Sequence, residues 1–154
     1  MLGHFLNLSE LVESVCERAR TAAAVKRQAF VMRVANGRNL EVRGDRSSLG
    51  RLFWTLLDNA IKYTPEGGRI EVALGWEGSQ ARVSVRDSGI GIGKEALPHV
   101  FDRFFRTESA RTQADGTGLG LAIAKWIADA HHATLSAEST VFEGTVFSIV
   151  FRAP

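Results

Sequence analysis

The stretch RIEVALGWEGSQARVSVRD, Arg69 to Asp87, alternates apolar and polar residues in two runs on either side of Gly78. Such alternation predicts two β-strands, 69–76 and 81–87, joined by a turn at the glycine. A short connection of this kind joins neighbouring strands that run in opposite directions, so the pair also favours an antiparallel sheet. This pair decides the fold class, because strands that follow one another directly are not parts of strand–helix–strand units.

The rest of the chain continues this order of elements. Apolar residues at helical spacing predict three helices, and alternating apolar runs predict four more strands. The helices are expected over 7–27, 46–64 and 119–132, and the strands over 29–34, 40–44, 133–140 and 144–151. The strands 29–34 and 40–44 lie around a turn-forming segment. Because strands mostly follow strands, the helices can cover only one face of the sheet. We therefore expect an α+β fold, a two-layer α/β sandwich whose mixed, mostly antiparallel sheet is covered by about three helices.

Length and composition limit the classes of protein that fit. The 154 residues, 45% of them hydrophobic, are enough for one compact domain over 1–154. The 19 basic and 17 acidic residues are scattered along the chain, so no basic stripe indicates a nucleic-acid partner. Cys16 is the only cysteine, which excludes an internal disulfide and a multi-cysteine zinc site.

The N-terminus and the apolar runs indicate where the protein works. The apolar runs are far shorter than a membrane span, and the N-terminus lacks the layout of a signal peptide. The single cysteine fits a reducing compartment. We therefore expect a cytoplasmic domain that makes no membrane contact of its own. We further expect the isolated domain to be monomeric, and its parent protein can be anchored in a membrane.

The helix expected over 46–64 carries polar groups at the margin of its apolar face. On a helical projection Asn59 lies at that margin, with Thr55 and Lys62 just beyond it. An amide oxygen can coordinate Mg²⁺ and an ammonium group can neutralise phosphate, so this rim could hold a metal–nucleotide complex. The alternative is an ordinary helix border at which polar side chains meet water, and the helix alone favours that alternative.

The stretch DSGIGIG, 87–93, directly follows a predicted strand and repeats glycine at every second position. Each glycine costs backbone entropy without adding to the core, so the repetition indicates a backbone that approaches something closely. The carboxylate of Asp87 at the strand end can accept a hydrogen bond from an exocyclic amino group, which favours adenine over guanine. The alternative is a flexible turn at the end of a strand.

A second glycine-rich stretch, DGTGLGLAIAK at 115–125, runs directly into the helix expected over 119–132. A helix N-terminus offers unpaired N–H groups and the positive end of the helix dipole, so phosphate is its natural ligand. Two common phosphate motifs are excluded, because Ser88 and Glu95 break the Walker A pattern and GTGLGL lacks the later glycine of the Rossmann pattern. The long segment between the two stretches is typical of a functional or mobile loop.

Five motifs, in order along the chain, resemble those of sensor histidine kinases. They look like the N, G1, F and G2 boxes and the last glycine box of that family: LLDNAIKYTPEGG (56–68), DSGIGI (87–92), FDRFFR (101–106), GTGLGL (116–121) and EGTVF (143–147). The family is part of a superfamily that also contains Hsp90, MutL and DNA gyrase B. The resemblance implies the Bergerat ATP-binding fold, with ATP and Mg²⁺ as cofactors and a long ATP lid over 94–115.

The resemblance also implies a role for each residue at a matching position. Asn59 would coordinate Mg²⁺, Lys62 would lie near the phosphates, and Tyr63 would line the nucleotide pocket. Asp87 would bind the adenine amino group, and Thr145 would lie near adenine. Further contacts would come from the glycine-rich backbone: Gly89 and Gly91 at the base and ribose, and Gly116, Thr117, Gly118, Leu119 and Gly120 around the phosphates.

The lid would contribute a cation and anchoring aromatics. Arg106 is the first candidate for contact with the γ-phosphate because it ends the F box, and Arg103 and Arg111 are the alternatives. The three phenylalanines of the F box are expected to pack rather than to contact the ligand. Gly93 and Gly116 would act as the hinges of the lid.

Two departures from the family's pattern limit what the chain can do alone. Thr55 stands where many histidine kinases have a second asparagine and where the Hsp90 group has a catalytic glutamate, so rapid ATP hydrolysis is not expected. None of the histidines has the acidic context of a phosphate-accepting histidine; they are His4, His99, His131 and His132. Residues 1–7 would be the end of a linker from a separate, histidine-containing dimerisation domain.

The resemblance therefore implies a protein-histidine kinase catalytic domain with Asn59, Lys62 and Arg106 as its catalytic residues. It would bind Mg·ATP and donate the γ-phosphate to a histidine on the dimerisation domain, with a response regulator as the downstream partner. Neutral imidazole is itself a nucleophile, so such a site needs no strong base. Three alternatives stay open: an ATPase of the Hsp90 or MutL kind, an anti-sigma-like serine kinase, and a catalytically silent nucleotide-binding module.

Overall fold

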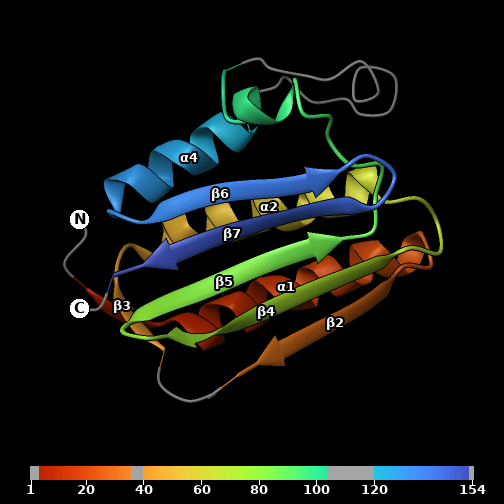
Figure 1. The fold of residues 1–154 in the computed structure, drawn as a ribbon. Helices are drawn as coiled ribbons and strands as arrows, with labels where there is room; N and C mark the ends of the chain where they lie inside the picture. The colour runs from red at the N-terminus through yellow and green to blue at the C-terminus, as the bar shows by residue number, and fades with distance from the viewer. Residues whose placement is uncertain (1–3, 36–39, 104–119, 153–154) are drawn as a thin grey trace.

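The computed structural model describes residues 4–35, 40–103 and 120–152. Within them the chain forms a five-stranded sheet with three α-helices against one face (Figure 1). The helices are α1 (Leu8–Val25), α2 (Arg46–Tyr63) and α4 (Gly120–Ala130), and a short 3₁₀ helix, η1, spans Leu97–His99. The strands are β1 (Phe5–Asn7), β2 (Ala29–Val34), β3 (Glu41–Arg43), β4 (Arg69–Glu77), β5 (Gln80–Asp87), β6 (Thr134–Thr140) and β7 (Gly144–Phe151).

The main sheet has the strand order β2-β4-β5-β7-β6. β2 runs parallel to β4 and the other neighbouring pairs are antiparallel, which confirms the expected two-layer α+β sandwich with a mixed, mostly antiparallel sheet. The register places Val72, Val85 and Phe147 side by side, and all three are buried. Because side chains alternate along a strand, the neighbouring Arg86 points to the opposite, open face.

Side-chain caps determine where α1 and α2 begin. Asn7 Oδ1 accepts a hydrogen bond from Glu10 N at 3.1 Å, and Asp45 Oδ2 accepts one from Ser48 N at 2.9 Å. Each cap satisfies a backbone N–H that has no partner inside its helix. The caps therefore set which residues of the two helices face the sheet.

The C-terminal end of α2 is fastened to the segment that leads into β2. Gln28 Nε2 donates hydrogen bonds to Ile61 O at 3.1 Å and to Thr64 O at 2.7 Å. Lys26 Nζ donates to Ile61 O at 2.8 Å. Carbonyl groups at the end of a helix have no donor within the helix, so these side chains replace it. They fix the position of the polar rim of α2.

Two features of strand pairing differ from the sequence-based expectation. The strands 29–34 and 40–44, expected around one turn, do not pair with each other, since β2 joins the main sheet and β3 pairs with β1. In the main sheet β2 packs Phe30 and Met32 against the core, a gain in buried apolar area that a separate hairpin would lack. β1 was not expected, because three residues are too few to show an alternating pattern.

None of the helices in 4–35, 40–103 and 120–152 is both long enough and apolar enough to cross a bilayer.

Candidate functional site

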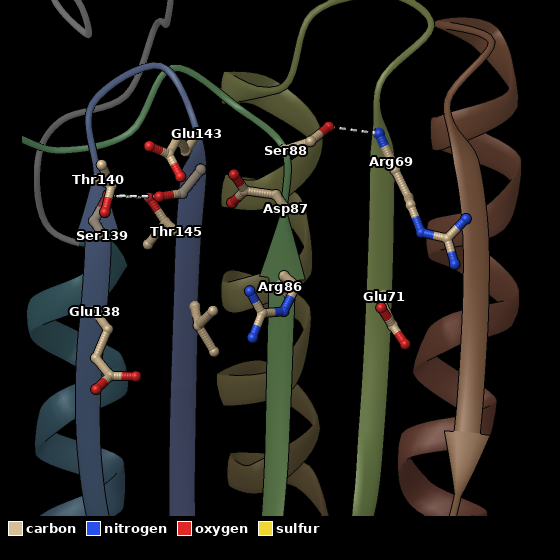
Figure 2. A pocket seen from close by; sticks show the side chains of 12 residues that line it. Arg69, Glu71, Arg86, Asp87, Ser88, Glu138, Ser139, Thr140, Glu143 and Thr145 are labelled. Carbon is tan, nitrogen blue, oxygen red and sulfur yellow. Dashed lines mark hydrogen bonds between the residues drawn. The ribbon is translucent and has the colours of Figure 1, made fainter.

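Asp87 and Thr145 meet at one edge of the sheet, where β5 ends and β7 begins. They are register partners, and the two residues are 6% and 5% exposed. Asp87 Oδ1 accepts a hydrogen bond from Gly89 N at 2.8 Å. Figure 2 shows the carboxylate between the ends of the two strands, beside Thr145. The two residues that the family resemblance places near adenine are therefore neighbours.

The electrostatic state of Asp87 is unusual for an aspartate. Burial raises the pKa of its carboxyl group to about 6, although hydrogen bonds from the backbone N–H groups of Gly89 and Thr145 lower it. The group is still ionised at neutral pH and is held in a largely dry place. A buried acceptor with a perturbed pKa at the end of a strand is typical of a binding site.

The glycine-rich segment after β5 lies tightly against the chain itself. A Cβ atom at Gly89 would overlap Tyr63 O, and one at Gly91, where φ is 76°, would overlap Thr140 O. Ile90 N also donates a hydrogen bond to Tyr63 O at 3.2 Å. The close backbone approach expected from these glycines is thus made, among the described residues, to the end of α2 and to β6. This close approach brings together three predicted site residues, namely Tyr63, Gly89 and Gly91.

The polar rim of α2 borders the same edge. Asn59 and Tyr63 are half-buried, and Lys62 is exposed with Nζ 3.2 Å from Asp58 Oδ2. The side-chain amide of Asn59 forms no hydrogen bond with another residue of the described segments. An exposed ion pair contributes little, so Lys62 can exchange Asp58 for another anion.

The start of α4 lies beside the middle of α2. A Cβ atom at Gly120 would lie 3.4 Å from Thr55 Cγ2. Thr55 Oγ1 donates a hydrogen bond to Arg51 O at 2.9 Å. The Thr55 hydroxyl hydrogen is therefore engaged by its own helix. The expectation that this residue does not activate water rests on the weak basicity of a hydroxyl group and stays a prediction.

Part of the expected site lies outside the described residues. This holds for positions 104–115 of the expected lid and for the site residues Arg106, Gly116, Thr117, Gly118 and Leu119. Of the F box, Phe101 is described, and its ring centroid lies 6.0 Å from that of Phe147 in an edge-on arrangement. Phe101 therefore packs on the core as expected, and the prediction that it makes no ligand contact stays a prediction.

Ser139 is a polar residue of this region that no sequence motif indicated. Its hydroxyl oxygen lies 2.7 Å from Ile92 N, 2.8 Å from Gly144 O and 2.8 Å from Thr145 Oγ1. One signal was present in the sequence, since Leu135, Ala137 and Ser139 alternate along β6 and only the last is polar on that face.

A cavity of about 280 Å³ opens at the same edge of the sheet (Figure 2). Besides Asp87 and Thr145, its lining includes Arg69, Arg86 and Glu138. The alternation of the strands places Arg86 and Glu138 on the face opposite the helices, as Figure 2 shows. Because the lining carries charges of both signs, this cavity does not by itself select an anionic ligand.

The described residues offer one group suited to a magnesium ion held mainly by a nucleotide. They contain no cluster of three or more histidine, cysteine, aspartate or glutamate side chains that could form a metal cage. Magnesium bound to substrate phosphates needs only one or two protein oxygens. The amide of Asn59, which has no other partner in the described segments, fits that requirement.

Comparisons with protein families and with curated proteins give matches of the same kind. The model of a family described as histidine kinase-, DNA gyrase B- and HSP90-like ATPase matches residues 44–154. The sensor histidine kinase YkoH of Bacillus subtilis is 45% identical over 114 residues, which are 73% of this chain and 25% of that protein. The chain thus spans about a quarter of the length of the curated relatives it matches.

Two solved structures share the fold over nearly the whole chain. The mycobacterial sensor histidine kinase MprB superposes with a TM-score of 0.87 at 34% identity, covering 98% of this chain and 99% of that one. The histidine kinase ThkA in complex with the response regulator protein TrrA superposes with a TM-score of 0.81 at 28% identity, covering 98% of this chain and 42% of that one.

Proposed function

Because the chain belongs to the histidine kinase-, DNA gyrase B- and HSP90-like ATPase family, as an ATP-binding catalytic domain of the sensor histidine kinase kind, we propose that it binds Mg·ATP and transfers the γ-phosphate to a histidine on a separate dimerisation domain. The observation that carries this proposal is the buried Asp87 carboxylate, which lies beside Thr145 and next to the polar rim of α2.

Asp87 gives the site its preference for adenine. An ionised carboxylate only accepts hydrogen bonds, and adenine offers an exocyclic amino group at the edge where guanine offers a carbonyl oxygen. A guanine carbonyl placed there would leave a buried acceptor facing another acceptor, which is the costliest kind of mismatch. Asp87 therefore accepts a hydrogen bond from the adenine amino group, and Tyr63 lines the pocket beside it.

The triphosphate would lie along α2 towards the start of α4. The side-chain amide oxygen of Asn59 would coordinate Mg²⁺, and Lys62 would leave Asp58 to neutralise phosphate. The backbone over 116–120 would wrap the phosphates at the helix N-terminus, and Arg106 would contact the γ-phosphate. Residues 94–115 would form the ATP lid.

Phosphoryl transfer at this site depends on positioning and on charge neutralisation. A nitrogen of the neutral acceptor imidazole forms a bond to the γ-phosphorus, the bond from that phosphorus to the β,γ-bridging oxygen breaks, and ADP leaves. The imidazole is nucleophilic without a base, so the chain needs only to bring the two reactants together. This agrees with the presence of threonine at position 55, because a hydroxyl group is too weak a base to take a proton at neutral pH.

The partners and location of the parent protein follow from this proposal. ThkA has been crystallised with a response regulator, and we propose that a response regulator likewise receives the phosphoryl group here. ATP and response regulators are cytoplasmic, so the domain would act in the cytoplasm.

Labelled phosphate transfer tests the proposal. The chain is mixed with γ-labelled Mg·ATP, with and without the dimerisation domain of its parent protein. Label on the added domain that is lost in acid and retained in base supports the proposal. Rapid release of phosphate by the chain alone would instead indicate an ATPase, an acid-stable label a serine kinase, and binding without transfer a silent module.

A further inference from the structure

Ser139 joins three segments at the edge of the sheet. Its hydroxyl oxygen contacts Ile92 of the loop after β5, Gly144 at the start of β7, and the side chain of Thr145. From these contacts we infer that Ser139 is a positioning residue for base recognition, which fixes the Thr145 hydroxyl as a hydrogen-bond acceptor without contacting the nucleotide. This inference rests on the proposed function.

The hydrogen atoms of these contacts can be assigned by counting donors. Ile92 N–H can only donate and Gly144 O can only accept, so Ser139 accepts from the first at 2.7 Å and donates its single hydrogen to the second at 2.8 Å. The third contact, 2.8 Å to Thr145 Oγ1, must then be donated by threonine. If Ser139 donated its hydrogen to Thr145 instead, no hydrogen would lie between Ser139 Oγ and Gly144 O. These two oxygen atoms would then face each other at 2.8 Å, which is unfavourable.

This assignment determines what Thr145 offers to a ligand. Its only hydroxyl hydrogen points to Ser139, so both lone pairs of Thr145 Oγ1 are available. Asp87, its register partner, is likewise an acceptor. The two hydrogens of an exocyclic amino group match a pair of acceptors, one directly and the other directly or through a water molecule. A carbonyl oxygen at the same place would face lone pairs on both sides.

Ser139 also holds the loop after β5 in place. Besides the hydrogen bond from Ile92, a second bond runs from Phe142 N to Ile90 O at 2.8 Å. The loop is therefore attached twice to the β6–β7 hairpin, and loss of Ser139 leaves one attachment. This hairpin carries Thr145, so the Ser139 hydroxyl fixes the position of the loop relative to the acceptor Thr145 Oγ1.

The experiment compares nucleotides that differ only in the amino group. Dissociation constants are measured for ATP and for the triphosphate of unsubstituted purine riboside, which lacks that group. Ser139→Ala is expected to weaken ATP binding about tenfold, the loss of roughly one hydrogen bond, and to weaken binding of the purine nucleotide about twofold or less. Ser139→Thr, which retains a hydroxyl, restores the preference. Ser136→Ala removes an exposed hydroxyl from the same strand and is the matched control.

A double-mutant cycle separates positioning from a general structural effect. Thr145→Val removes the acceptor while leaving the Ile92 and Gly144 contacts of Ser139 in place, and it tests the acceptor even if Ser139→Ala fails to fold. Once Thr145 is valine, Ser139→Ala should cause no further loss of the preference for ATP. Equal weakening of both nucleotides by Ser139→Ala, or an unchanged preference in Thr145→Val, would overturn the inference. A wild-type chain that binds no Mg·ATP would overturn the proposed function as well.

Discussion

His131 Nε2 accepts a hydrogen bond from the Asp45 backbone N–H at 3.1 Å, which ties the turn after α4 to the N-cap of α2. The other ring nitrogen, Nδ1, lies 2.8 Å from Ile127 O and donates to it. Replacing His131 with alanine leaves the part-buried N–H of Asp45 without a partner, and it leaves a space where the imidazole ring lies against Gly44. We expect a loss of about 2 kcal/mol in the free energy of unfolding, measured by chemical denaturation.

The neighbouring histidine provides a control for this variant. His132 is exposed and has φ of 57°, a conformation that asparagine tolerates. His132→Asn should change the free energy of unfolding by less than about 0.5 kcal/mol. Equal losses in the two variants would contradict a specific role for the bond between His131 and Asp45.

Acid should weaken nucleotide binding through Asp87. Its pKa is raised to about 6, and protonation removes the acceptor that the adenine amino group needs. For a single group with this pKa, affinity at pH 5 should be about tenfold lower than at pH 8. Competition with a fluorescent nucleotide across this range measures the effect. Asp87→Asn binds more weakly, and its affinity should follow only the titration of the phosphates. A wild-type profile that matches that of the variant would contradict the assignment.

The same carboxyl group should make the folded state less stable at neutral pH. Its pKa rises from 3.8 to about 6 on folding, so the folded state binds the proton more tightly than the unfolded state. Stability from this group is therefore fully present below pH 3.8 and is lost as pH rises through about 6. Asp87→Asn does not titrate, so between pH 4 and pH 8 it should gain up to about 3 kcal/mol relative to wild type. Denaturation at several pH values would measure this gain, and a constant difference would contradict it.

Much of this fold could be predicted because its patterns are local. β4 and β5 alternate cleanly, and Asn7 and Asp45 mark the starts of their helices by capping. The pairing of β2 could not be predicted in this way. Whether Ala29 lies beside Arg69 or beside a residue of β3 depends on packing against α1 and on a partner about 40 residues away.

The same distinction between local patterns and long-range contacts applies to the site. Asp87 and Thr145 belong to sequence motifs, and the antiparallel register of β5 and β7 makes them neighbours. Ser139 belongs to no motif, and its role arises only when three segments meet around one oxygen atom. The contact between Lys62 and Asp58 was also not expected, although the two residues are one helical turn apart and of opposite charge.

The attachment of α2 to the segment before β2 should matter for both stability and binding. Gln28→Ala leaves the carbonyl groups of Ile61 and Thr64 without this donor, in a buried place. We expect a loss of about 2 kcal/mol in the free energy of unfolding and a weaker affinity for Mg·ATP, because this end of α2 carries the polar rim. Gln80→Ala, which removes an exposed glutamine from the start of β5, should change neither quantity. Unaltered nucleotide affinity in a destabilised Gln28→Ala variant would show that the attachment serves only the fold.

Two glycines with positive φ allow the stability cost of backbone strain to be measured apart from the cost of a steric overlap. Gly67 has φ of 84°, and beyond its chain neighbours no atom of the described residues lies within 4 Å of the place where a Cβ atom would be. Gly91 has φ of 76°, and its Cβ would overlap Thr140 O. Gly67→Ala should therefore cost only the strain of the left-handed conformation, about 1 kcal/mol. Gly91→Ala carries the same strain and must also move the loop away from β6, so we expect at least about 3 kcal/mol.

Nucleotide binding distinguishes these two variants further. The loop that Gly91 belongs to is joined to Ser139 through Ile92 N, so a displaced loop also disturbs the acceptor at Thr145. Gly91→Ala should lower ATP affinity even at temperatures where the variant is fully folded, and Gly67→Ala should not. Denaturation curves and titration with Mg·ATP on the same samples measure both effects. Equal costs in the two variants would show that φ alone dictates glycine at Gly91, and that its packing against β6 contributes nothing to the site.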